Sequence, residues 1–378
     1  MTIEEYFNTP SVDAKNILLL LKEKHNVLIS GPPATGKTRL LAEIRHWFSQ
    51  APTPKFIPNG PSPFPANQAG HEIIDVLPSP EKEKRKVFPI TFHQGTKYRD
   101  FITGLAPDPT ASTAKFLVTT GVLYKAAMHA DSENSTSLLV IDEINRGPAV
   151  AIFGDAINAI ETDKRKKPDG TISDMTWTFP LLMQDGGYSE ISFSHHLYIL
   201  AAMNQADTSV EPLDVAFLRR FEPYELSPNE NVVRTLFKIE SEHASELPDN
   251  PSEAKHILEA LTRAWTEINR LISIARGSEF EIGHGVMMDI DPTKVGTDLE
   301  YAKVFALKVW KRLYAHISEV FFGDTLGLAS ILKADQAGSL FSIEYVDFAD
   351  SSIANLQGKN NVTKDNIYKL LINISKNG

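Results

Sequence analysis

The sequence has 378 residues, of which 42% are hydrophobic and 23% charged, a composition typical of a globular protein with two or three domains. Its formal net charge of -10 provides no general basic field for nucleic acid, so any such contact needs a local patch or a partner subunit. The absence of cysteine excludes disulfides, thiol catalysis and thiolate metal sites. The start of the chain lacks the pattern of a signal peptide, and no apolar run approaches the ~20 residues of a membrane-spanning helix. We therefore expect a soluble cytoplasmic protein that makes no membrane contact.

The first predicted elements surround a glycine-rich loop. Residues 11–24 carry apolar side chains along one helical face, and Val27-Leu28-Ile29 has the β-branched, apolar character of a buried strand. A further helix is predicted over 39–48. Between that strand and helix, Gly31-Pro32-Pro33-Ala34-Thr35-Gly36-Lys37-Thr38 fits the phosphate-loop pattern G-x-x-x-x-G-K-[ST] at every fixed position.

The loop has the chemistry that a nucleoside triphosphate requires. Gly31 and Gly36 allow backbone N–H groups to turn toward the phosphates, and the following helix directs its positive end at the same anion. Lys37 is predicted to reach the β- and γ-phosphates, and the Thr38 hydroxyl to bind Mg²⁺. The alternative is an ordinary turn between a strand and a helix. The predicted nucleotide contacts here are Gly31, Pro32, Pro33, Ala34, Thr35, Gly36, Lys37, Thr38 and Arg39.

A proline-rich segment follows the loop. Eight prolines between residues 51 and 80 exclude a helix, so we predict an irregular surface insertion over 51–86 that ends in the mixed charge run 81–86. That run is interpreted as a solvated loop, with a nucleic-acid patch as the alternative. A strand is predicted over 87–92, a loop with a short helix over 93–105, and a helix over 122–130.

Two predicted strands end in polar residues. Leu138-Leu139-Val140-Ile141 reads as a strand buried on both faces and is followed by Asp142 and Glu143. After a phosphate loop, the first carboxylate would hold Mg²⁺ and the second would orient the attacking water, although such a pair can also cap a helix. Asn204 follows the apolar run 197–201 and is predicted to sense the γ-phosphate or place the water. The alternative is a turn asparagine.

The segment between those strands predicts an insertion. A helix is expected over about 149–161. The basic run 164–167 is interpreted as a solvated turn, with contact to DNA or a partner as the alternative. Strands over 177–182 and 190–193 flank Asp185-Gly186-Gly187, a hairpin signal. We therefore predict a β-hairpin insertion over about 164–195.

Two arginines end the next short helix, predicted over 213–220. Arg219 and Arg220 could simply complement the end of that helix, or one could act as an arginine finger in a neighbouring subunit's nucleotide site. From residue 227 the pattern becomes helical, with helices predicted over 231–240, 252–276, 299–322 and 363–374. We predict an α/β nucleotide-binding domain over 1–226, built as an αβα sandwich with a parallel central sheet, and a small α-helical lid domain over 227–378.

The motifs together resemble the McrB-like branch of the AAA+ P-loop NTPases. Gly31–Thr38 is similar to its Walker A loop and Val140–Arg146, which includes Asn145, to its extended Walker B. The segments that carry the rest of the resemblance are Phe92–Leu105, Leu197–Asp207 with its M-N-x-x-D pattern, Phe217–Phe221, and Phe280–His284 with its I-G-H pattern. The resemblance covers residues 12 to 325. It adds Asp207 and His284 to the predicted nucleotide contacts.

The resemblance implies a Mg²⁺-dependent hydrolase of GTP or ATP that forms a homo-oligomeric ring, usually a hexamer, with nucleotide at the subunit interface. It also implies a McrC-like partner that bears a nuclease, and a role in restriction and antiviral defence. Two positions depart from the family pattern: Thr208 replaces an arginine, and Gly285–Met288 replaces an aromatic pair. The first leaves GTP and ATP as alternatives. No DNA-reading domain precedes the Walker A loop, so contact with DNA is expected through partners.

Two other hypotheses remain open at this point. A MoxR-type AAA+ ATPase would remodel a protein client without DNA, and a nuclease-bearing gene neighbour would argue against it. A nucleotide-gated assembly switch would not require the second carboxylate, Glu143. The catalytic residues expected from sequence are Lys37, Glu143, Asn204, Arg219 and Arg220, with Thr38 and Asp142 as the metal ligands.

Overall fold

The computed structural model describes residues 9–50, 75–109, 115–183, 185–206, 213–240, 246–291, 293–348 and 351–376. The chain forms two compact units. The sheet unit contains the chain up to Ser30 together with Lys37–Glu225, and the helical unit contains Gly31–Gly36 together with Leu226–Gly378. The six residues Gly31–Gly36, which include most of the phosphate loop, therefore pack with the helical unit.

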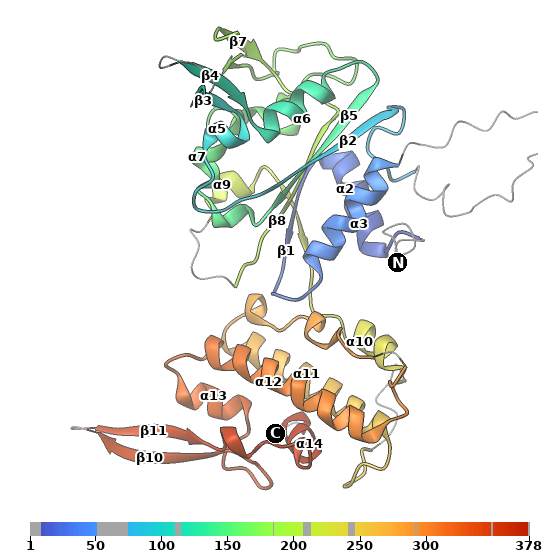
Figure 1. Ribbon diagram of the computed structural model, residues 1–378, viewed down its shortest axis with the longest axis vertical. Helices are drawn as coiled ribbons and strands as arrows, with labels where there is room; N and C mark the ends of the chain where they lie inside the picture. Colours follow the sequence, from blue (N-terminus) through green and yellow to red (C-terminus); the bar gives the residue numbers. More distant parts are fainter. Residues whose placement is uncertain are drawn as a thin grey trace, which may run out of the picture. The chain divides into compact units, whose positions relative to one another are not determined.

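The sheet unit is built on five parallel strands, which confirms the predicted parallel central sheet (Figure 1). Their spatial order is β2-β5-β8-β1-β9. Every pair of neighbours is parallel, so the carboxyl ends of all five strands lie along one edge. The strands are β1 (Asn26–Ser30), β2 (Lys84–Thr91), β5 (Ser135–Asp142), β8 (Leu197–Ala202) and β9 (Glu222–Glu225).

Helices cover both faces of this sheet, because its central strands are apolar on both sides. Every residue of β1 and β8 is buried. Figure 1 shows α2 (Val12–Lys24) and α3 (Lys37–Ser49) on one face, with α5 (Tyr98–Phe101), α6 (Val122–Ala130) and α7 (Ala149–Phe153) on the other. This is the αβα sandwich of the AAA fold.

Three details of the sheet unit differ from the sequence prediction. The segment predicted as a loop and short helix over 93–105 contains both, with α5 as the helix, but its last residues begin a hairpin formed by β3 (Thr103–Pro107) and β4 (Phe116–Thr120). Its glycine, proline and exposed apolar positions gave no clear period-two signal. The helix predicted over 149–161 is divided into α7 and α8 (Ala156–Ala159) at Gly154. Gly154 has a φ of 49° and faces the Tyr98 ring, where a Cβ would lie 2.8 Å from a ring carbon.

The third difference concerns the charge run 81–86. Its last three residues belong to β2, which begins at Lys84. Arg85 explains this, because its guanidinium donates hydrogen bonds to the backbone oxygens of Phe48, Ser79 and Pro78, each at 2.7 Å. The run is therefore partly structural. The predicted hairpin insertion is present as β6 (Phe179–Leu182) and β7 (Tyr188–Ile191).

The helical unit packs its apolar helix faces around one core. Its helices are α10 (Glu230–Phe237), α11 (Ala254–Ala275), α12 (Leu299–Val320), α13 (Thr325–Ile331) and α14 (Ile367–Ser375). The sequence predicted only helices here, and the structure adds an antiparallel hairpin of β10 (Ser342–Phe348) and β11 (Ser351–Gln357). The hairpin was missed because its strands are largely exposed and lack the apolar alternation that marks a half-buried strand.

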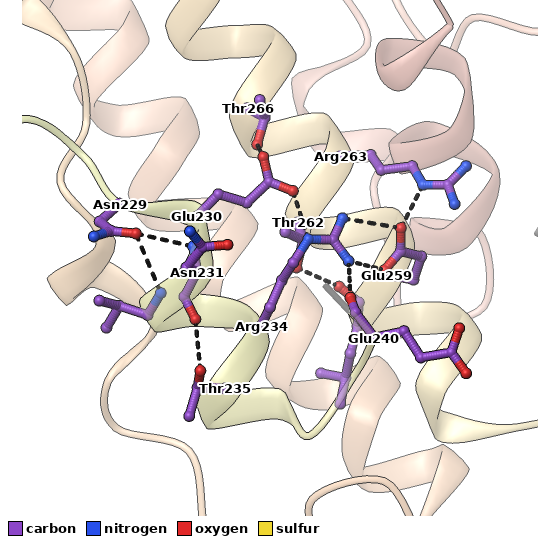
Figure 2. Close-up of polar contacts among 12 residues, drawn as sticks. Asn229, Glu230, Asn231, Arg234, Thr235, Glu240, Glu259, Thr262, Arg263 and Thr266 are labelled. Atoms are coloured by element: carbon purple, nitrogen blue, oxygen red, sulfur yellow. Dashed lines mark hydrogen bonds and ion pairs between the residues drawn. The ribbon is translucent and has the colours of Figure 1, made fainter. Parts of the chain in front are cut away.

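A buried arginine joins α10 to α11 (Figure 2). The Arg234 side chain is 3% exposed, and its Nε donates to Glu230 Oε1 at 2.6 Å. Its Nη1 donates to Glu259 Oε2 at 2.8 Å. Charge-assisted bonds of this kind compensate the burial of the guanidinium, and removing one partner would leave an unpaired charge in the core. The network fixes the position of α10, whose first turn lies beside the I-G-H motif described below.

Candidate functional site

The carboxyl ends of β5 and β8 bring together the acidic and amide residues predicted from sequence. The two strands are parallel neighbours in a register that pairs Ile141 with Ala201. Asp142 is the last residue of β5, and Glu143 follows it in the left-handed region with a φ of 53°. Asn204 Nδ2 donates a hydrogen bond to Glu143 Oε1 at 2.7 Å. The left-handed backbone, uncommon for glutamate, turns this side chain toward the neighbouring strand end.

Two further residues support Glu143 and Asn204. In the sequence, these two supporting residues were marked only by the family resemblance. Asn145 is 6% exposed and donates from Nδ2 to the backbone oxygen of Asn204 at 2.9 Å. Arg146 Nε lies 3.2 Å from Glu143 Oε2. One carboxylate oxygen of Glu143 is thus hydrogen-bonded and the other lies at ion-pair distance from Arg146, while Asn145 fixes the backbone that carries Asn204. Their position directly after two acidic residues was the available sequence signal.

Lys37 is the first residue of α3 and is 8% exposed. Burial lowers the pKa of its ammonium group from 10.5 to about 8, and the Glu143 and Asp142 carboxylates oppose that shift. Lys37, Asp142 and Glu143 therefore act on one another electrostatically within the sheet unit. Thr38 and Arg39, the next two residues of α3, are exposed.

The donor set suits Mg²⁺ bound together with a nucleotide. The described residues contain no cluster of three or more histidine, cysteine, aspartate or glutamate side chains able to hold a metal ion by themselves. The hydroxyl of Thr38 and the carboxylate of Asp142 are oxygen donors of the kind that Mg²⁺ accepts alongside phosphate and water. These residues fit a Mg²⁺–nucleotide complex rather than a metal cage made of protein alone.

The rest of the phosphate loop lies in the helical unit, and its glycines are required there. Gly31 has a φ of 147°, and a Cβ on it would lie 2.2 Å from the backbone oxygen of Leu226. Gly36 has a φ of 93°. Thr35 Oγ1 donates to the Pro32 backbone oxygen at 2.9 Å, which closes the turn. These features give the compact glycine-rich turn expected of an anion-binding loop.

The I-G-H motif, Ile282-Gly283-His284, packs on the outer turn of this loop. Gly283 N donates to the Pro33 oxygen at 3.0 Å, and Gly285 N donates to the Ala34 oxygen at 2.8 Å. A Cβ on Gly283 would lie 2.1 Å from the Ala34 carbonyl carbon, so only glycine permits this approach. The motif therefore holds the backbone of Pro33 and Ala34 through the residues that flank His284.

His284 is oriented by the start of α10. Its Nδ1 accepts a hydrogen bond from the backbone N–H of Asn229 at 3.3 Å, so a neutral ring carries its proton on Nε2. Nε2 lies 4.0 Å from the point that a Cβ on Gly36 would occupy. Asn229 also caps α10 by accepting from Asn231 N at 2.9 Å (Figure 2). The ring thus presents a donor toward the phosphate loop.

The structure separates the two candidate arginines. Arg220 is 7% exposed and donates to the Ile157 oxygen at 2.8 Å and to Asn158 Oδ1 at 2.7 Å, and it also pairs with Glu161 at 3.1 Å. The Arg219 side chain is exposed and makes no hydrogen bond or ion pair with any residue that the structure describes. The Arg220 guanidinium is bonded within the sheet unit, whereas the exposed Arg219 side chain can contact a partner.

Two other predictions need comment. Asp207, predicted to contact nucleotide, lies outside the described residues, as does Thr208.

In the basic run 164–167, Arg165 is 3% exposed and its Nη2 donates to Asn26 Oδ1 at 2.6 Å, while Lys166 Nζ lies 2.7 Å from Asp131 Oδ1. Lys164 Nζ also lies 3.8 Å from Asp163 Oδ2, so three of the four residues of that run have partners within the sheet unit.

Residues 77–221 match the family model of the AAA domain (dynein-related subfamily). This chain carries an AAA domain. The matched range includes both strand ends with Asp142, Glu143 and Asn204, and the arginines, and it begins after the phosphate loop. An AAA domain implies nucleoside-triphosphatase activity and the usual association with Mg²⁺.

Two curated relatives come from restriction systems. The Type IV methyl-directed restriction enzyme EcoKMcrB subunit of Escherichia coli K12 is 25% identical over 279 residues, covering 73% of this chain and 50% of that protein. The Type II restriction enzyme BsuMI component YdiS of Bacillus subtilis 168 is 29% identical over 200 residues, covering 52% of this chain and 55% of that protein. The chain is thus a distant homologue of both, and it spans about half the length of each.

Among solved structures, a Cytophaga hutchinsonii protein aligns with 98% of this chain and 88% of its own length, at 12% identity and a TM-score of 0.31. The fold assignment of the AAA domain rests instead on the strand order and the family model. Among the described residues, no helix is both long and apolar enough to cross a membrane.

Proposed function

We propose that this protein is a ring-forming AAA NTPase that hydrolyses GTP or ATP and drives a restriction or antiviral defence complex. The observation that carries the proposal is the group of residues at the ends of β5 and β8. Asn204 donates a hydrogen bond to the Glu143 carboxylate, and the Asp142 and Glu143 carboxylates both stabilise the charge of Lys37. Hydrolysis needs a carboxylate beside a cation that binds phosphate, and a binding module does not need the second acid.

Each residue of the candidate site has a role in this proposal. Lys37 binds the β- and γ-phosphates, and the backbone of Gly31–Gly36 surrounds them with N–H donors. Glu143 accepts a proton from the attacking water, and Asn204 aims that carboxylate. Thr38 and Asp142 would hold Mg²⁺, which supplies charge neutralisation at the phosphates when it is bound.

The helical unit contributes His284 to the same chemistry. With its Nδ1 occupied by the Asn229 N–H, the neutral imidazole donates from Nε2 toward a phosphate oxygen at the loop. The hydrogen bonds of Gly283 and Gly285 to the loop backbone give the helical unit a direct response to loop conformation. We propose that nucleotide binding is transmitted to the helices by this route.

A neighbouring copy of the chain completes the site in this proposal. Arg219 is exposed, and its guanidinium would stabilise charge on the transferring phosphate of the adjacent subunit. A ring of six copies is proposed from the family resemblance. The exposure of Arg219, against the complete internal bonding of Arg220, supports the assignment of the finger to Arg219.

The biological role is proposed from the relatives, whose names place both in restriction enzymes. We propose a McrC-like partner that bears the nuclease, with DNA reached through partners. The net charge of -10 supports this division of labour.

The test is a steady-state assay of phosphate release with GTP and with ATP, each with and without the product of the neighbouring gene. Turnover of one nucleotide that rises with the neighbour's product is the expected result. Turnover that Glu143→Gln leaves undiminished would overturn the hydrolytic assignment. Turnover of ATP that a protein client stimulates, with no nuclease partner involved, would favour the MoxR-type alternative.

A further inference from the structure

The helical unit contains a polar pocket of about 570 Å³ whose residues have no role in the proposed hydrolysis. It lies between α14, α12, the segment before α11, and the loop at Ala337-Gly338. Its volume is in the range of small-ligand sites. All of these elements belong to the helical unit, in the part that includes the C-terminal helix of Figure 1.

The pocket is basic although the whole chain is acidic. Its walls include two aspartates, Asp249 and Asp365, and four lysines, Lys303, Lys364, Lys369 and Lys376. Glu300 pairs with Lys303 at 2.7 Å and with Lys364 at 3.1 Å. Lys369 and Lys376 form no ion pair within the part of the chain that the structure describes. Lys369 and Lys376, both exposed, therefore line the pocket without an ion pair to its two aspartates or to any other described residue.

A buried amide lies between those two lysines. Lys369 and Asn373 are spaced four residues apart on α14, so they share one face of the helix, and Lys376 directly follows the last helical residue, Ser375. Asn373 is 9% exposed, and its Nδ2 is buried with no hydrogen-bond acceptor among the described residues. A buried donor without an acceptor is costly, and a ligand oxygen that reached Asn373 Nδ2 would remove that cost.

The loop at Gly338 closes this arrangement. A Cβ on Gly338 would lie 3.9 Å from both Asn373 Oδ1 and Lys369 Cε. The amide, the lysine stem and the glycine therefore meet at one point of the pocket wall. Because glycine has no Cβ, space remains there beside the Asn373 amide oxygen and the Lys369 stem.

We propose that this α14 pocket binds a phosphate group, carried on a free nucleotide-sized anion or at the end of a nucleic acid strand. Phosphate is compact, doubly charged and rich in acceptor oxygens, which matches two unpaired ammonium groups beside an amide. The acidic character of the rest of the chain would confine such an anion to the pocket. The proposal is independent of catalysis at the phosphate loop.

The experiment is isothermal titration of the full chain carrying Lys37→Ala, which removes the phosphate-binding lysine of the loop. The probes are inorganic pyrophosphate and a single strand of about ten nucleotides, with and without a 5′-phosphate. Lys369→Gln with Lys376→Gln is expected to weaken pyrophosphate binding at least about tenfold, because two charge-assisted contacts are lost. Asn373→Leu is expected to weaken it as well.

The matched control is Lys125→Gln with Lys311→Gln, which removes the same charge from two exposed lysines outside the pocket. The proposal would be overturned if the pocket double variant and Asn373→Leu bound pyrophosphate as tightly as the control variant does. This holds whether all three variants keep their affinity or all three lose it equally. Strand binding that requires the 5′-phosphate would assign the ligand to a strand end. Pyrophosphate binding without strand binding would assign it to a free anion.

Discussion

Asn204 Nδ2 donates to Glu143 Oε1 at 2.7 Å across the carboxyl ends of two neighbouring strands. The contact joins residues 61 positions apart, and parallel pairing of β5 with β8 is what makes it possible. The contact aims the proposed general base by means of a residue that lies just beyond the end of another strand. Substitutions of Glu143 and of Asn204 should therefore lower the hydrolysis rate to different extents.

Glu143→Gln is expected to retain nucleotide affinity and to lose about 10²–10⁴-fold in kcat, because the amide cannot accept the proton of water. Asn204→Ala should lower kcat less and leave Kd similar, since the carboxylate remains but is no longer aimed. Nucleotide binding by fluorescence and phosphate release, measured on the same samples, distinguish the two. If both variants lost nucleotide affinity in parallel, Asn204 would be a structural residue.

Lys37 is expected to make nucleotide binding sensitive to pH. Its pKa in the protein without nucleotide is about 8, below the ordinary 10.5, because burial disfavours the charge. As pH rises above 8 the ammonium loses its proton, so affinity for the triphosphate should fall, by up to about tenfold per pH unit. Titrations from pH 7 to 9.5 check this, and Lys37→Arg should flatten the profile because arginine stays charged.

The pKa of Lys37 also affects folding stability, with the opposite sign. Between pH 8 and 10.5 the unfolded chain binds the proton more readily than the folded one does, so this group makes stability rise with pH in that window. Urea unfolding of the wild type and of Lys37→Met at pH 7 and 9.5 measures the effect. The wild type should gain stability relative to the variant at the higher pH.

The two arginines should respond differently to truncation. Arg219→Ala is expected to leave Tm unchanged and to reduce turnover about 10³-fold or more, as loss of an arginine finger does. Arg220→Ala should destabilise the fold by about 1–3 kcal/mol, because backbone oxygens and Glu161 lose their partner. Thermal unfolding and phosphate release report the two effects separately.

A mixing experiment tests whether Arg219 acts in a neighbouring subunit. Arg219→Ala protein lacks the finger but keeps Glu143, and Glu143→Gln protein has the reverse defect. Mixed rings should recover part of the turnover, because some interfaces combine an intact Arg219 with an intact Glu143. Failure to recover at every mixing ratio would argue against action in trans.

Gly283→Ala is expected to weaken nucleotide binding, because the added Cβ would lie 2.1 Å from the Ala34 carbonyl carbon and must displace the loop. The control is Gly187→Ala, where the new Cβ meets only the Asp185 carboxylate at 3.4 Å. Nucleotide Kd and Tm should change for the first variant and not for the second. An unchanged Kd in Gly283→Ala would show that the loop does not depend on the motif.

Much of the AAA domain was predictable because its signals are local. A complete phosphate-loop pattern, unbroken apolar runs and the residues after them do not depend on distant contacts. The hairpins β3–β4 and β10–β11 were not predictable, because their stability comes from pairing rather than from a periodic apolar face. Arg85 and Arg165 looked like parts of solvated charge runs. Only backbone oxygens brought close by folding explain why Arg85 is partly buried and Arg165 buried.

The sequence by itself determined the residue types of the site: Lys37, Asp142, Glu143 and Asn204 stand beside elements whose class local composition decides. Tertiary structure decided how those residues are used. The pairing of β5 with β8 brings Asn204 within hydrogen-bond distance of Glu143. The contacts of Arg220 with Ile157 and Glu161 occupy its guanidinium, so Arg219 is the arginine that can reach a neighbouring subunit. Likewise, only folding placed Gly283 against the phosphate loop. The reason is physical: secondary structure follows from the neighbours of a residue in sequence, whereas a hydrogen-bond partner is chosen by the chain's path through space.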